Sequence, residues 1–191
     1  MLRNAALVMT LAIAAPTAST PNDIPPPNVP TNLTVEAGNN PFLIAGAAGT
    51  QNYVCLPSAT GIKWTLFGPQ ATLFDDQGEQ ILTHFLSSNA DEGGTPRATW
   101  QHSRDTSSVW AMAIADSSDS NYVAPGAIPW LLLRVVGKAD GPTGGGKMTQ
   151  TTFIQRVNTA GGVAPAAGCH APKDVGKRVL VPYTTDYVFY R

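Results

Sequence analysis

The stretch TTFIQRVN, Thr151–Asn158, carries the clearest secondary-structure signal in the chain. Apolar and polar side chains alternate along it, which is the period of two expected of a β-strand rather than the 3.6 of a helix. One face of the strand would carry Thr151, Phe153, Gln155 and Val157, and the other Thr152, Ile154, Arg156 and Asn158. The stretch therefore predicts a strand that places an arginine and an asparagine on the same face as an isoleucine.

Similar short runs fill the rest of the chain and are separated by turn residues, among 18 glycines and 16 prolines in 191 residues. Runs of this kind, without an amphipathic helix between them, predict an all-β single domain, a β-sandwich or barrel of about 8–10 short, mostly antiparallel strands with little helix. The candidate strands are 42–45, 52–56, 62–67, 71–74, 80–86, 98–102, 108–115, 130–136, 151–158 and 178–190, the last of which Pro182 could interrupt.

The N-terminal residues 1–19 have the composition of a signal peptide. Arg3 precedes an apolar run from Ala5 to Ala15, and small residues follow. A run of about eleven apolar residues is too short to span a bilayer and suits a secretory signal. We therefore expect a signal peptide over 1–19, a proline-rich extended lead-in over 20–40 and the all-β domain over 41–191. The mature protein would be secreted, or periplasmic in a bacterial host, and would lack a transmembrane segment.

Composition and cysteine content narrow the classes of function. Only 13% of the residues are charged and the formal net charge is −1, so no basic surface is available for nucleic acid. The chain has two cysteines, Cys55 and Cys169. In an oxidising compartment an even, small number of cysteines favours a structural disulfide.

The stretch GPTGGGKM, Gly141–Met148, has the glycine and lysine spacing of a phosphate-binding loop. Such a loop needs a Ser or Thr hydroxyl after the lysine and a helix directly behind it. Here Met148 occupies the hydroxyl position, and the run that follows has a strand pattern. The stretch therefore predicts a glycine-rich connection between two strands, and no ATPase activity.

Three further segments carry a family resemblance: GTQNYVCLP (49–57), FIQRVNTAGGVAPAAGC (153–169) and VPYTTDYVFY (181–190), together with IPWLLL at 128–133. With them the chain resembles, over about residues 29–191, the secreted family known as domain of unknown function 3455. The resemblance implies an exported all-β domain with no established activity. Where that family has an Asp-Gly-Ser-x-Val turn, this chain has Asp105-Thr106-Ser107-Ser108-Val109.

Some members of that family carry dehydrogenase names. A dinucleotide fold needs a Gly-x-Gly-x-x-Gly turn that opens a helix after a strand. The sequence has neither this turn nor an alternation of strands and helices. We therefore do not expect an NAD-dependent dehydrogenase, and no cofactor is predicted.

Polar residues on apolar strands are the best candidates for function. His84 shares a strand face with Leu82 and Leu86, and it either packs as a hydrogen-bonded core residue or serves as the polar group of a pocket. Arg156 would form a buried ion pair with Asp186, or would instead grip a ligand. The candidate ligand-binding residues are His84, Trp100, Arg156, Asn158, Tyr183, Asp186 and Tyr187. The histidines lack metal-ligand spacing, so no metal site is predicted.

Three functions remain open. The first is a protein that binds a small molecule or glycan through a polar and aromatic pocket or face. The second is a secreted hydrolase or isomerase that uses His84 as general base near Asp186. The third is a surface or interaction protein without a pocket.

Overall fold

The structure is a computed structural model that describes residues 24–191. The expected signal peptide, 1–19, and the first residues of the lead-in lie outside the described residues. Within residues 24–40 the lead-in has no strand and forms one short 3-10 turn, η1 (Thr31–Leu33). No helix between residues 24 and 191 has the length and apolar character needed to cross a membrane.

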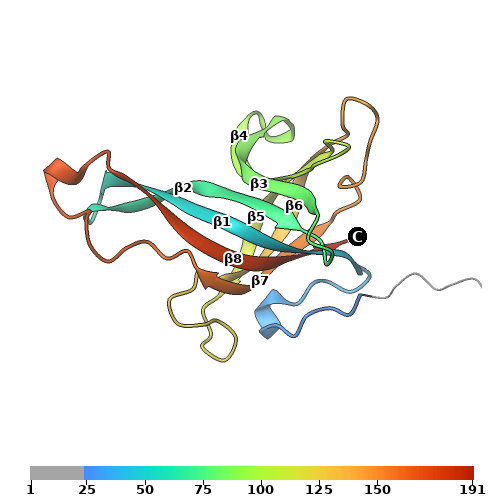
Figure 1. Cartoon of the computed structure of the whole chain (residues 1–191), viewed down its shortest axis with the longest axis horizontal. Coiled ribbons are helices and arrows are strands. Elements are labelled where there is room, and N and C mark those ends of the chain that lie inside the picture. The colour runs from blue at the N-terminus through green and yellow to red at the C-terminus, as the bar shows by residue number, and fades with distance from the viewer. Residues whose placement is uncertain (1–23) are drawn as a thin grey trace, which may run out of the picture.

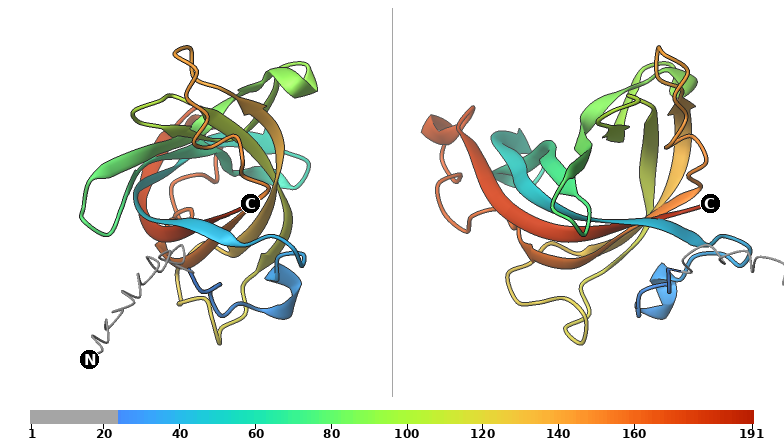
Figure 2. Two further views of the ribbon diagram at one scale, coloured as in Figure 1. Left: turned by 90° about the vertical axis from the view of Figure 1, so that its right-hand side faces the viewer. Right: turned by 45° about the vertical axis from the view of Figure 1, so that its right-hand side comes forward.

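Residues 41–190 form an antiparallel barrel of eight strands, in which each strand pairs with its neighbour in the chain and β8 pairs with β1 to close the ring (Figures 1 and 2). The all-β fold is therefore confirmed, and the architecture is a barrel rather than a sandwich. The strands are β1 (Pro41–Ser58), β2 (Gly61–Phe74), β3 (Gln80–Asn89), β4 (Thr95–His102), β5 (Ser108–Ser117), β6 (Trp130–Ala139), β7 (Phe153–Gly161) and β8 (Arg178–Tyr190). Two further 3-10 turns, η2 (Ala90–Glu92) and η3 (Pro172–Asp174), lie in the connections.

The first four predicted strands merge into two long ones, β1 with 18 residues and β2 with 14. Glycines and a proline lie between these predicted runs and indicate turns. In the structure they are part of the continuous strands β1 and β2. Gly49 lies so close to β2 that a Cβ atom at this position would stand 2.6 Å from the Cβ of Ala71. A glycine in a strand often marks such a close backbone approach. Pro182 likewise leaves β8 unbroken.

Apolar side chains pack on both sides of the sheet. The inner cluster fills part of the barrel, and the outer cluster lies between β6, β7, β8 and the lead-in, which Figure 1 shows beside β7. In β7, Ile154 belongs to the inner cluster and Phe153 and Val157 to the outer one. Gln155 also faces outward, where its amide donates to the carbonyl of Leu33. The face with Thr151, Phe153, Gln155 and Val157 is therefore buried, whereas on the other face Ile154 is buried and Asn158 is exposed.

The glycine-rich stretch 141–148 is a loop between β6 and β7, and it closes one end of the barrel. Met148 is fully buried in the inner cluster. The backbone N–H groups of Lys147 and Met148 donate to Asp105 Oδ2 at 2.9 Å and Ser107 Oγ at 3.0 Å. Thr106, in the turn at 105–109, adopts a left-handed conformation with φ of 58°. The turn at 105–109 thus keeps a structural role in holding the Met148 loop.

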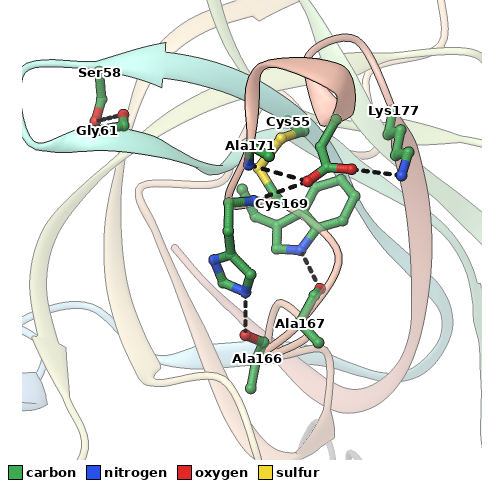
Figure 3. Close-up of a disulfide and its surroundings, with 11 residues drawn as sticks. Cys55, Ser58, Gly61, Ala166, Ala167, Cys169, Ala171 and Lys177 are labelled. Atoms are coloured by element: carbon green, nitrogen blue, oxygen red, sulfur yellow. Dashed lines mark hydrogen bonds and ion pairs between the residues drawn. A yellow bond between two sulfur atoms is a disulfide. The ribbon is translucent and has the colours of Figure 1, made fainter.

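A disulfide joins Cys55 and Cys169, as predicted from the cysteine count (Figure 3). Cys55 lies near the end of β1, in the part of the β1–β2 hairpin that extends away from the rest of the barrel in Figure 1. The bond ties this hairpin to the long connection between β7 and β8. The indole of Trp64 adds a hydrogen bond to the carbonyl of Ala167 at 3.0 Å. The disulfide indicates an oxidising, extracellular-type environment.

Replacing both cysteines, Cys55→Ala with Cys169→Ala, should strongly destabilise the protein. The bond spans a sequence separation of 114 residues, and the chain-entropy model assigns about 4–5 kcal/mol to a loop of this size. Guanidinium unfolding of wild type and the double variant measures the difference. Equal free energies of unfolding would show that the bond contributes nothing to stability.

Candidate functional site

A cavity of about 420 Å³ lies at the end of the barrel opposite the Met148 loop. Every strand contributes a residue to it, because alternate side chains of a closed barrel point inward. Its floor is formed by well-buried residues, and its rim by more exposed ones. The floor consists of Gln51, His84, Trp100, Ala111, Leu133 and Tyr187, and the rim includes Leu66, Phe67, Leu86, Pro96, Arg97 and Ala113.

Three aromatic rings form one side of the floor. His84 stacks on Trp100 with ring centroids 4.1 Å apart and planes 14° from parallel. The ring of Tyr187 meets both edge-on, at 5.2 Å from His84 and 5.3 Å from Trp100. All three side chains are at least 97% buried. The three rings pack into one aromatic cluster that lines the cavity.

His84 is neutral at physiological pH. Burial lowers its pKa to about 3, more than a hydrogen bond with the backbone of Thr99 raises it, and the charge of Arg156 lowers it further. The Nδ1 atom lies 2.8 Å from the Thr99 carbonyl. A carbonyl only accepts, so Nδ1 carries the proton and Nε2 keeps its lone pair. Such a weak base is poorly matched to general base catalysis near pH 7.

Arg156 brings a positive charge to the cavity. Its Nε and Nη2 donate to the carbonyl of Pro129, at 3.2 and 2.7 Å. Among residues 24–191 no carboxylate lies within salt-bridge distance of it. Burial raises the pKa of Tyr187, and the nearby Arg156 charge acts against that rise. The guanidinium therefore faces the aromatic cluster without an acidic partner.

Asp186 does not pair with Arg156, contrary to one expectation from the sequence. It lies on β8 beside Tyr187, and adjacent residues of a strand point to opposite faces. Its carboxylate accepts a hydrogen bond from Asn158 Nδ2 at 2.8 Å, in a separate, shallow depression.

Asn158 also leaves the face that alternation predicted for it. The pairing of β7 with β8 shifts register between Val157 and Ala160, and Asn158 adopts a left-handed φ of 53°. A bulge of this kind breaks the alternation of side chains, and asparagine tolerates the conformation better than most residues. The structure therefore brings together His84, Trp100, Arg156 and Tyr187, and places Asn158 and Asp186 elsewhere.

Tyr183 lies behind the cavity wall. Its hydroxyl is 3.4 Å from that of Tyr187, and the side chain is buried. Burial raises its pKa far above the ordinary value, and the neighbouring Tyr187 adds to the rise. Both hydroxyls are therefore protonated, and Tyr183 supports Tyr187 from the inside of the barrel.

Two residues that line the cavity carry a hydrogen-bond donor that is unsatisfied within residues 24–191; the sequence singled out Trp100 and missed Gln51. Gln51 Nε2 and Trp100 Nε1 are buried and have no hydrogen-bond partner among the described residues. Both residues line the cavity. A third such donor, Trp130 Nε1, lies in the outer cluster. Gln51 was overlooked because the predicted strand began at 52; extending the strand by one residue would have placed it on the sheet.

The rim is largely apolar and carries no free charge. Leu66, Phe67 and Leu86 expose 53%, 66% and 42% of their surface. Arg97 is also at the rim, but it donates from Nε and Nη2 to both carboxylate oxygens of Glu92 at 2.7 and 2.8 Å. The cavity thus combines an apolar rim with hydrogen-bond donors at its floor.

The three histidines lie in three different parts of the structure. His84 lies in the cavity, His102 lies beside Asp105 near the Met148 loop, and His170 follows the disulfide. Within the part of the chain that the structure describes, no three His, Cys, Asp or Glu side chains are arranged to hold a metal ion.

The family described as "Protein of unknown function (DUF3455)" matches residues 36–191. The chain belongs to this family. The match covers the whole barrel, including the residues that form the cavity. No match was found among curated proteins or among solved structures.

Acidification should destabilise the protein through His84. Its folded pKa of about 3 lies below the ordinary value of 6.5. As the pH falls, the imidazole is therefore protonated in the unfolded chain before it is protonated in the folded protein. The stability that neutral His84 contributes is present above about pH 6.5 and is lost progressively toward pH 3. Between pH 7 and 5 the loss should be about 2 kcal/mol.

Denaturant unfolding of wild type and His84→Phe at pH 7, 6 and 5 measures this effect. Phenylalanine keeps a ring against Trp100 but does not titrate, so the pH dependence should shrink by about 2 kcal/mol in the variant. Identical pH profiles would mean that His84 is not desolvated in the folded protein.

Proposed function

We propose that this protein is an exported binding protein that takes one small molecule into the open end of its barrel. The observation that carries the proposal is a pair of buried donors on cavity-lining residues, Gln51 Nε2 and Trp100 Nε1, which have no hydrogen-bond partner within residues 24–191. A buried donor left unsatisfied costs about 1–3 kcal/mol. A ligand that supplied acceptors would remove this cost, and Arg156 stands beside the same floor.

The dimensions and lining of the cavity support a small molecule over a glycan. An eight-stranded barrel has room inside for side chains or for one small ligand. Ligand pockets are typically mostly apolar, with a few placed polar groups. Small side chains, Ala98, Ala111 and Ala113, line the cavity where larger ones would fill it. The disulfide and the expected signal peptide over 1–19 support export, to the cell exterior or to a bacterial periplasm.

Two other functions are less well supported. An enzyme with His84 as general base would need Asp186 within reach, but Asp186 points away from the cavity and His84 is a weak base. A surface protein without a pocket would have no use for a cavity to which all eight strands contribute residues.

An uncharged fluorescent probe, N-phenyl-1-naphthylamine, tests whether the cavity binds small molecules. We expect its emission to increase with wild-type protein. Ala98→Phe, which adds a ring at a half-buried position of the lining, should abolish at least about 90% of the increase. Ala160→Phe makes the same change at an exposed position of β7 and should bind the probe like wild type. Absence of any probe signal, or equal signals in both variants, would refute the proposal.

A further inference from the structure

We infer that the ligand is an amphipathic monocarboxylate, an organic acid with an apolar chain or ring, whose carboxylate reaches the cavity floor while its apolar part lies toward the rim. The inference rests on the proposed function and names the class of ligand. Three features of the cavity lead to it: the kind of hydrogen-bonding group on the floor, the net charge, and the apolar rim.

The floor presents hydrogen-bond donors beside one acceptor, the lone pair of His84 Nε2. Gln51 Nε2 and Trp100 Nε1 are donors without a partner in the part of the chain that the structure describes, and the indole N–H cannot accept. Arg156 adds a guanidinium whose Nε and Nη2 donate to the carbonyl of Pro129 and which also interacts with the Tyr187 hydroxyl. A carboxylate offers about four lone-pair sites and no proton, so it suits a floor with more than one donor.

One negative charge on the ligand would balance the charge of the site. Two arginines line the cavity, and no aspartate or glutamate does within the described residues. Arg97 is already neutralised by Glu92, whose pKa the Arg97 hydrogen bonds lower to about 2. His84 is neutral. Arg156, which is only partly buried, alone remains uncompensated; a charge withdrawn from water favours one counter-charge, so a monoanion fits better than a phosphate dianion.

The rest of the cavity is suited to hydrocarbon. Alanine and leucine side chains, among them Ala98 and Leu131, form the walls. Leu66, Phe67 and Leu86 continue this surface to the rim, where all three are more than 40% exposed. Large apolar side chains rarely gather at an exposed edge without something to cover. An apolar chain that leaves the floor would cover them.

Competition between matched ten-carbon compounds tests the inference. Decanoate, decan-1-ol and decylamine are each titrated against the uncharged probe N-phenyl-1-naphthylamine bound to the protein. The titrations are made at pH 7.5 and low salt, below the concentrations at which the three compounds aggregate. We expect decanoate to bind at least about tenfold more tightly than decan-1-ol, because a charge-assisted hydrogen bond to Arg156 is roughly twice as strong as a neutral one. Decylamine, which brings a second positive charge, should bind most weakly.

Variants then assign the preference to Arg156. Arg156→Gln should weaken decanoate at least about tenfold and change decan-1-ol by less than about threefold, whereas Arg156→Lys should keep most of the preference. Arg134→Gln is the matched control, since Arg134 is exposed on the neighbouring strand β6 and does not line the cavity.

Gln51→Met removes a floor donor without changing the charge. It should weaken decanoate several-fold, leave decan-1-ol unchanged and raise the melting temperature of the ligand-free protein, because an unsatisfied buried group is lost. This variant tests the inference even if Arg156→Gln fails to fold.

The outcomes separate the inference from the function on which it rests. If decan-1-ol displaces the probe as well as decanoate does, or if the preference survives Arg156→Gln, the carboxylate assignment is wrong while the binding function stands. If neither the probe nor any of the three compounds binds, the binding function itself is wrong.

Discussion

The pairing of β1 with β8 is the interaction on which the rest of the structure depends. It runs from Pro41 opposite Tyr190 to Val54 opposite Arg178 and turns a meander of neighbouring strands into a closed ring. Closure removes the sheet edges and gives every strand an inside and an outside. Once the ring is closed, inward-facing residues share one lumen, whatever their separation in sequence.

The two ends of that lumen are filled differently. At one end the glycine-rich loop inserts Met148, held by the turn at 105–109. At the other end small alanine side chains line the barrel, and the cavity remains between the strands. The same alternation that buries Tyr187 inside the ring turns Asp186 outward. The lumen therefore contains the side chain of Arg156, from β7, but not the carboxylate of Asp186, from β8. The chemistry of the cavity, donors and one positive charge, follows from that placement.

Much of the fold could be predicted from the sequence, because period-two alternation and turn residues are local signals. The disulfide followed from the cysteine count. The merging of the first predicted strands could not be foreseen, because glycines such as Gly49 indicate turns until the close approach to Ala71 is known. Asn158 was misplaced because a bulge is set by the register with β8. The lack of a partner for Gln51 Nε2 is a property of the closed lumen and has no local signal.

The central claim is that the floor of the barrel holds hydrogen-bond donors which a bound acid would engage, and the indole N–H signals in NMR spectra of ¹⁵N-labelled protein test it most directly. Trp64 and Trp110 already donate to Ala167 and Ser87, whereas the indole of Trp100 has no partner among residues 24–191. On titration with decanoate we predict that the Trp100 signal, identified by its loss in Trp100→Phe, moves strongly while those of Trp64 and Trp110 stay in place. A bound acid that leaves the Trp100 signal unmoved would contradict the account.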